Sequence, residues 1–223
     1  MNDMNDSIAQ NLLGFKSHLP EEVTLVAVSK TKPVSDLMKA YDSGQRIFGE
    51  NKVQELTQKW EAMPKDIQWH MIGHLQTNKV KYIASFVELI HSLDRLKLAK
   101  EINRQGERHR KIIDCLVQIK IAKEEEKYGF SMEEAFEFLS DLNSNPLPYV
   151  RILGVMGMAT FTADQQQIKD EFALLEDFYL KHQKTFGFEV LSMGMSGDYT
   201  LALDHGSNMI RVGSAIFGSR TSH

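Results

Sequence analysis

Residues 24–42, TLVAVSKTKPVSDLMKAYD, hold the two patterns that decide the fold. The first six residues form a short apolar run typical of a buried strand, and residues 34–42 have the weak apolar spacing of a helix. Lys30 stands where the strand is expected to end. A buried strand followed at once by a helix is the unit from which parallel sheets are built.

The same unit recurs along the chain. Short apolar runs predict eight strands, at residues 24–29, 46–49, 68–73, 89–93, 114–122, 150–158, 188–195 and 208–213. Helical spacing lies between them, weakly at residues 34–42, 51–63, 78–86 and 95–104, and more clearly around Met132–Leu139 and Ile168–Phe178. We therefore expect strands and helices to alternate through most of the sequence.

Eight alternating units favour an α/β fold with one closed (βα)8 TIM-type barrel. An open, doubly wound sheet stays possible, because eight strands counted by pattern can be seven. Ile8, Leu12 and Phe15 share one face of an extra N-terminal helix, which we expect to pack near the closure of the barrel. The segment after the last strand, SAIFGSRTSH, predicts a truncated last helix. Residues 1–223 are expected to form a single domain, since no linker divides them.

Composition excludes several classes of partner. The formal net charge of -4 gives no basic surface for nucleic acid, and we interpret the cluster Arg104, Arg108, Arg110 and Lys111 as a solvated loop. No stretch reaches the ~20 apolar residues of a membrane span, and no basic N-terminal segment indicates export. The single cysteine, Cys115, can form no internal disulfide. We expect a cytoplasmic monomer.

Lys30 has two interpretations. In a barrel, binding and catalytic groups gather at the carboxyl ends of the strands, which is where Lys30 is expected. It can pair with a carboxylate such as Glu50, or it can act as an amine that attacks a carbonyl group to form a Schiff base. The second role requires the pKa of the amine to fall well below its ordinary value.

Other strand ends carry further candidates. Asn51, in the FGEN motif, can be a helix N-cap, a ligand contact, or both. His70 and His74 are four residues apart in WHMIGHLQTNK, which would place them on one face of a strand, or as a metal pair on a helix. Without an accompanying HExxH glutamate or a second cysteine, we expect no metal.

The segment LSMGMSGDYTLALDHGSNMIRVGSAIFG, residues 191–218, predicts an anion site. Ser196 and Gly197 are expected to open a short helix after the seventh strand, and Gly213 and Ser214 follow the eighth. Backbone N–H groups that converge after these two strands of a barrel frequently hold a phosphate. Arg211 lies in an apolar run, either as a structural ion pair or as a donor aimed into the site.

Taken together, these residues outline a pocket for pyridoxal 5′-phosphate. Lys30 would hold the aldehyde, Ser196, Gly213 and Ser214 the phosphate, and Arg211 would face the ring nitrogen. A guanidinium can only donate a hydrogen bond, so the ring nitrogen opposite it would be unprotonated and a poor electron sink.

Motifs across nearly the whole chain resemble the pyridoxal phosphate homeostasis protein family. They are AVSKTKP, FGEN, WHMIGHLQTNK, SLDR, LGVMGMAT, LSMGMSGDY and IRVGSAIFG, between residues 25 and 218. The resemblance implies a barrel akin to the N-terminal domain of alanine racemase, with pyridoxal phosphate as an internal aldimine on Lys30. It also places Asn51 beside the cofactor and implies buffering or transfer of cofactor to apo-enzymes, with effects on amino-acid and keto-acid balance.

The resemblance leaves two functional classes to weigh. Family members commonly have a smaller residue where this chain has Tyr128, which puts a role of Lys127 in cofactor transfer in question. A cofactor carrier is favoured over an amino-acid racemase, because the chain stops at His223 without the second domain that supplies a tyrosine base in alanine racemases. Failure to bind the cofactor would indicate a third class, an α/β protein that only resembles these barrels.

Overall fold

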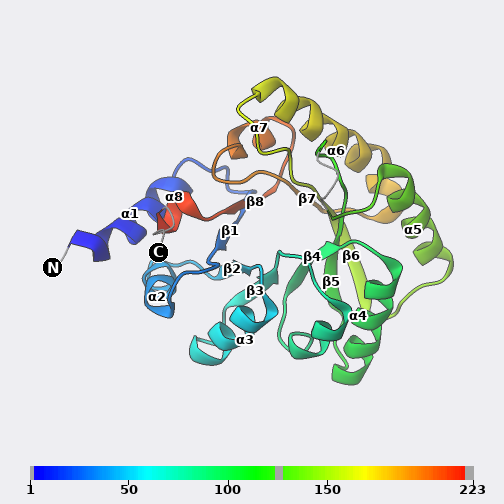
Figure 1. Cartoon of the computed structure of the whole chain (residues 1–223), viewed down its shortest axis with the longest axis horizontal. Coiled ribbons are helices and arrows are strands. Elements are labelled where there is room, and N and C mark those ends of the chain that lie inside the picture. The colour runs from blue at the N-terminus through cyan, green and yellow to red at the C-terminus, as the bar shows by residue number, and fades with distance from the viewer. Residues whose placement is uncertain (1–2, 124–127, 219–223) are drawn as a thin grey trace.

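The computed structural model describes residues 3–123 and 128–218 and shows a closed barrel of parallel strands (Figure 1). The strands pair in chain order, and β8 closes the barrel by pairing with β1. The predicted (βα)8 barrel is therefore confirmed, and an open sheet is wrong. The strands are β1 (Thr24–Val28), β2 (Ile47–Glu50), β3 (Gln68–Met71), β4 (Leu89–Leu93), β5 (Ile113–Gln118), β6 (Val150–Met156), β7 (Val190–Ser192) and β8 (Met209–Val212).

Helices follow the strands and surround the barrel (Figure 1). They are α1 (Asp3–Lys16), α2 (Val34–Asp42), α3 (Val53–Ala62), the 3₁₀-helix η1 (Thr77–Tyr82), α4 (Leu96–His109), α5 (Met132–Ser144), α6 (Gln165–Phe186), α7 (Tyr199–Asp204) and α8 (Ser214–Phe217). The predicted α2 has the observed bounds. The helix expected at residues 78–86 is wrong in type, because the weak helix formers Thr77, Asn78 and Val80 form a 3₁₀ segment instead.

The extra N-terminal helix covers the closure of the barrel, as predicted. Leu12 of α1 is fully buried, and the Asn11 side chain donates to the Ile216 carbonyl of α8 over 3.3 Å. The Phe15 ring packs on Tyr199 of α7, with 4.7 Å between ring centroids. In Figure 1, α1 and α8 lie together beside β1 and β8. The α1 helix thus takes the place that a longer last helix would fill.

Alternate residues of each strand face two separate apolar clusters. The inner cluster contains Val26, Leu89, Leu116, Met156 and Met209, one from each of five strands. Their chain neighbours, such as Leu25, Ala27 and Ile210, belong to the larger cluster between the barrel and its helices. Because side chains alternate along a strand, residues two positions beyond the inner cluster also point into the barrel.

Several predicted boundaries are wrong, for one reason. The runs predicted at 114–122, 150–158 and 188–195 continue past the observed ends of β5, β6 and β7, because buried apolar residues such as Ile119 and Met193 lie in the loops beyond.

The prediction that the basic cluster forms a loop is also wrong in part. Arg104 and Arg108 lie within α4, and Arg110 is the C-cap with a left-handed φ of 53°.

Candidate functional site

All six predicted site residues lie at the carboxyl ends of four neighbouring strands, β7, β8, β1 and β2. Ser196 follows β7, Arg211 is on β8 with Gly213 and Ser214 after it, Lys30 follows β1, and Asn51 follows β2. The register joins these ends, because Ala27 of β1 pairs with Val212 of β8 and Val28 pairs with Gly49 of β2. The barrel therefore brings residues that are far apart in sequence to one side of its mouth.

Arg211 lies inside the barrel near this mouth. Only 4% of the residue is exposed, and it follows Met209 on the inward face of β8. Its guanidinium donates to the Ser192 hydroxyl over 2.6 Å and to the Gly157 carbonyl over 3.0 Å. Burial lowers the pKa of Arg211 to about 10, so the side chain is charged at neutral pH. Both hydrogen-bond acceptors are neutral, and the buried Asp198 carboxylate stabilises the charge electrostatically. The side chain thus combines a nearby opposite charge with a position at the mouth from which it could donate to a ligand.

The loops after β7 and β8 meet at Gly213. The Gly213 amide donates to the Ser196 hydroxyl over 3.2 Å, which joins the two loops. An added Cβ at Gly213 would lie 3.1 Å from the Val28 carbonyl oxygen, so glycine allows β8 to end close against β1. Within the described ranges, the amides of Ser196, Gly197, Ser214 and Ala215 donate no hydrogen bond. The predicted helix start at Ser196 is wrong, since α7 begins at Tyr199 with Asp198 as N-cap.

Lys30 occupies a tight turn that follows β1. The Lys32 amide donates to the Ser29 carbonyl over 3.1 Å, and Thr31 between them has a left-handed φ of 65°. This combination corresponds to a type II turn with Lys30 at its second position. Ser29 points outward, where its hydroxyl donates to Glu50 over 2.6 Å. β1 ends at Val28, so Lys30 lies in this turn, two residues beyond the strand.

The ion pair of Glu50 is made by a residue that the sequence did not indicate. Glu50 is fully buried outside the barrel wall, and the Lys59 ammonium of α3 donates to it over 2.7 Å. Burial raises the pKa of Glu50, and Lys59 and Ser29 act against that rise. A lysine at helical spacing gave no sign of burial in the sequence, since most lysines are exposed.

Asn51 is not the N-cap of α3. That position is held by Lys52, whose side chain makes no capping hydrogen bond. Asn51 instead lies where its backbone meets Gly73, after β3: a Cβ on Gly73 would be 2.3 Å from the Asn51 carbonyl oxygen. Glycine at position 73 therefore lets two strand ends approach each other at the mouth.

The two histidines of WHMIGHLQTNK separate. The His70 and His91 rings lie inside the barrel with 2.9 Å between Nδ1 and Nε2, and burial lowers the pKa of His70 to about 3. His74 lies beyond β3, stacks on Tyr128 at 3.8 Å between centroids, and contacts the Asp94 carboxylate at 3.2 Å. His91 on β4 and Ser192 on β7 alternate with the outward-facing apolar residues of their strands. This alternation was a sequence signal that could have identified both side chains as inward-facing.

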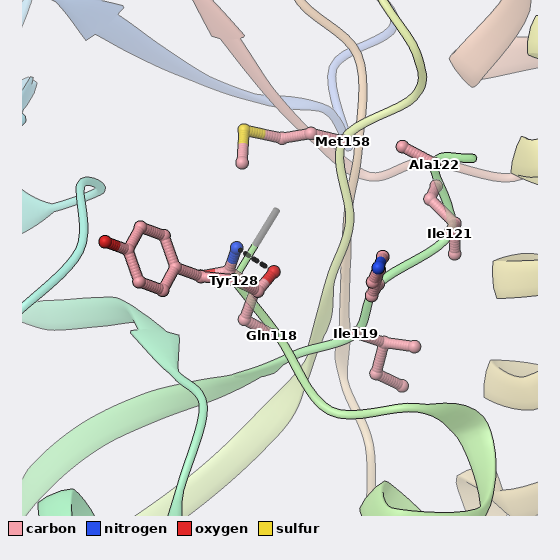
Figure 2. Close-up of a pocket in the computed structure, with 7 residues that line it drawn as sticks. Gln118, Ile119, Ile121, Ala122, Tyr128 and Met158 are labelled. Carbon is pink, nitrogen blue, oxygen red and sulfur yellow. Dashed lines mark hydrogen bonds between the residues drawn. The ribbon is translucent and has the colours of Figure 1, made fainter. Parts of the chain in front are cut away.

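A shallow pocket lies at the same mouth, after β5 and β6 (Figure 2). Tyr128, Gln118 and Met158 line one part of it, and the Gln118 amide donates to the Tyr128 carbonyl over 3.0 Å (Figure 2). None of the six predicted site residues lines this pocket. Lys127, the residue considered for cofactor transfer, lies outside the described residues.

The described part of the chain has neither a metal-binding cluster nor a membrane-spanning helix. No cluster of three or more histidine, cysteine or acidic residues there could hold a metal ion. No helix in the described ranges is both long and apolar enough to span a membrane.

Comparisons of sequence and of structure with known proteins agree on one family. Residues 5–221 match the model of the alanine racemase N-terminal domain. The pyridoxal phosphate homeostasis protein of Vibrio alginolyticus is 39% identical over 207 residues, which cover 90% of this chain and 88% of that protein. Two structures of PipY from Synechococcus elongatus, one without and one with bound pyridoxal phosphate, have TM-scores of 0.89 and 0.85 and are 34% and 33% identical, each covering 95% of this chain and 100% of that one. The chain therefore belongs to the pyridoxal phosphate homeostasis protein family, within the wider family of alanine racemase N-terminal domains.

Proposed function

We propose that this chain is a single-domain carrier of pyridoxal 5′-phosphate, which it holds through Lys30 and passes to apo-enzymes that need the cofactor. The observation that carries the proposal is the placement of Lys30, Arg211 and the joined loops of Ser196 and Gly213 at the carboxyl ends of the neighbouring strands β1, β8 and β7. We further propose that it acts as a cytoplasmic monomer, in keeping with its single cysteine, Cys115, which is buried.

The loops after β7 and β8 fit a phosphate group. Four amides there, those of Ser196, Gly197, Ser214 and Ala215, have no acceptor among the described residues, and the Ser196 hydroxyl adds a further polar group. Ser214 and Ala215 are exposed, so these amides are open to a ligand. Phosphate oxygens accept several such hydrogen bonds at once. These residues would hold the phosphate.

Arg211 and Lys30 fit the two ends of the cofactor ring. Arg211 would donate to the ring nitrogen, which must then be unprotonated because a guanidinium has no acceptor. The bound cofactor supplies an aldehyde that condenses with a primary amine. Lys30 is the amine at this mouth that we assign to that attachment, and Asn51 would lie beside the ring.

Borohydride trapping tests the proposal. Purified protein loaded with pyridoxal phosphate is reduced and digested, and mass spectrometry locates the cofactor. We expect it on the peptide that contains Lys30, and we expect Lys30→Ala to lose it while the variant remains folded and retains some phosphate binding. Lys52→Ala, at an exposed position after the next strand, is the matched control. Equal trapping in Lys30→Ala would show that another lysine carries the cofactor.

A racemase is the second candidate, and one observed contact and one proposed contact argue against it. A second proton donor is needed opposite Lys30, and Tyr199, the nearest tyrosine at the phosphate loops, packs its ring on Phe15 of α1. An arginine at the ring nitrogen also weakens the cofactor as an electron sink. Incubation of the loaded protein with single enantiomers of alanine or serine in deuterated water should give no rapid inversion or α-proton exchange. Turnover of roughly one per second or more, lost in Lys30→Ala, would establish the racemase instead.

A further inference from the structure

A buried ionic network lies directly behind the Lys30 turn. The Lys59 ammonium donates to Glu50 over 2.7 Å, to Glu55 over 2.7 Å, and to the Ser29 carbonyl over 2.8 Å. An ammonium has three donors, and all three of these are used. Lys59 is 5% exposed and Glu50 is fully buried, so water screens this network little.

The network holds both residues that flank Lys30. On one side, the Ser29 hydroxyl donates to Glu50 over 2.6 Å and its carbonyl accepts from Lys59. On the other side, the Thr31 amide donates to Glu55 over 2.6 Å. Lys30 itself lies between these two fixed points, in the turn that follows β1. The network therefore holds the backbone on both sides of Lys30.

The turn needs this support because its backbone is strained. Thr31 has a φ of 65°, in the region that favours glycine or asparagine. A β-branched residue there is strained and persists only where surrounding contacts hold it. The Glu55–Thr31 hydrogen bond is such a contact.

Stability alone does not explain these charges. Replacing a buried ion pair by packed apolar residues is often neutral or stabilising, so a barrel gains little from burying the Glu50–Lys59 pair here. One oxygen of Glu50, Oε2, has no hydrogen-bond partner within the described ranges. Burial raises the pKa of Glu50, which shows that the carboxylate is held at a cost.

We propose that Glu50, Lys59 and Glu55 are positioning residues, which fix the Lys30 turn so that its amine meets the cofactor aldehyde. The inference rests on the proposed function, in which Lys30 is the attachment site. It adds that two different groups of residues control two different quantities. The loops of Ser196 and Gly213 determine the affinity for the cofactor, and the network determines the rate at which Lys30 forms the covalent link.

The test separates binding from capture. Affinity is measured with pyridoxine 5′-phosphate, which has the ring and phosphate but no aldehyde, and capture is the rate of formation of the borohydride-reducible link to Lys30. We expect Glu55→Ala and Lys59→Met to bind pyridoxine 5′-phosphate within about threefold of the wild type. Their capture rates should fall about tenfold to a hundredfold, as for a misplaced reacting group. Glu55→Gln, which keeps an acceptor for the Thr31 amide, should recover most of the rate.

Gln58→Met, at an exposed position on the same helix, is the control and should match the wild type in both measurements. Capture by Glu55→Ala at the control rate would overturn the proposal, and so would equal losses of affinity and capture in that variant. If Lys59→Met does not fold, Glu55→Ala still decides, because the Glu55 side chain is 22% exposed and leaves the Glu50–Lys59 pair intact.

A failure of the proposed function would be recognised separately. If the wild type captures no pyridoxal phosphate at Lys30, the carrier assignment fails. Crystal structures of the wild-type and Glu55→Ala apo-proteins then test whether the network holds the Lys30 turn. We expect Thr31 in Glu55→Ala to leave the left-handed region. Retention of its φ near 65° in that variant would show that the network does not hold the turn.

Discussion

Arg211 shows how one residue can constrain the chemistry of a site. Its guanidinium is buried and bonded to the Ser192 hydroxyl and the Gly157 carbonyl, neither of which carries a charge. The buried Asp198 carboxylate stabilises this charge electrostatically, and a ligand that accepts a hydrogen bond would stabilise it further. An aromatic nitrogen acceptor would use the remaining donor capacity of the guanidinium, and it would be kept unprotonated. In the proposed function, the same residue would both support binding and limit turnover.

Arg211→Gln tests this role. We expect the wild type to prefer pyridoxal phosphate over its 1-deaza analogue, in which C–H replaces the ring nitrogen, by roughly tenfold or more, since a hydrogen bond from a charged group contributes ~1.5–3 kcal/mol. Arg211→Gln should lose most of this preference, measured by equilibrium dialysis. The same preference in both proteins would contradict the assignment, as would a crystal structure with a carboxylate at the ring nitrogen.

At the scale of elements, the mouth depends on close approaches between strand ends. Gly73 after β3 lies against the backbone of Asn51 after β2, and Gly213 after β8 lies against Val28 of β1. Parallel strands pair at fixed spacing, so a side chain at either position would push neighbouring ends apart. The positions of Asn51 and of the phosphate loops thus follow from how the strands end.

Gly73→Ala should therefore be costly. Its Cβ would lie 2.3 Å from the Asn51 carbonyl oxygen and 2.7 Å from the Asn51 Cα, and backbone cannot move aside as a flexible side chain can. We expect a loss of about 1–3 kcal/mol in the free energy of unfolding, with weaker binding of pyridoxine 5′-phosphate. Gly14→Ala in α1 is the control: nothing lies within 4 Å of its added Cβ. It should stabilise the helix by about 0.5–1 kcal/mol. Equal effects of the two substitutions in urea unfolding would contradict this view of the mouth.

At the scale of the whole molecule, the barrel interior has an apolar layer and a polar layer. Val26, Leu116 and Met209 belong to the apolar layer, while His70 and His91 lie further along the inward faces of β3 and β4. Burial lowers the pKa of both histidines, and the charge of Arg211 adds to this effect for His91. The interior therefore keeps the pair neutral, beside a cation.

This neutrality predicts how stability depends on pH. The pKa of His70 falls from 6.5 to about 3 on folding, so between these values the unfolded chain binds more protons than the folded one. The contribution of His70 to the free energy of unfolding is fully present above pH 6.5 and declines as the pH falls from 6.5 toward about 3. By pH 5 the loss from His70 is about 2 kcal/mol.

Urea unfolding of His70→Gln between pH 8 and pH 5 checks this dependence. The stability of the variant should change less with pH than that of the wild type. His109→Gln, at an exposed position, should retain the wild-type slope. Glu50, whose pKa is raised by burial, acts in the opposite direction and is common to all three proteins, so their difference isolates the histidine. An unchanged slope in His70→Gln would contradict the prediction.

The sequence determined most of the segments that form strands and helices, and it predicted the candidate site residues. Alternation of apolar and amphipathic segments is a local property, so it predicted eight βα units and placed Lys30, Asn51 and the loops of Ser196 and Gly213 at strand ends. It did not determine where strands stop, since apolar residues such as Ile119 remain buried in the loops beyond.

Only the tertiary structure decided which side chains meet. Closure of β8 onto β1 pairs Arg211 with Val26 and brings Gly213 against Val28, two residues before Lys30. Glu50, on the outward face of β2, forms its ion pair with Lys59 of α3 and not with Lys30. The pairings of Lys59 with the Ser29 carbonyl and of His70 with His91 likewise join residues thirty and twenty-one positions apart. Such contacts depend on register and on the direction of each side chain, which are fixed when the sheet closes and which no local pattern encodes.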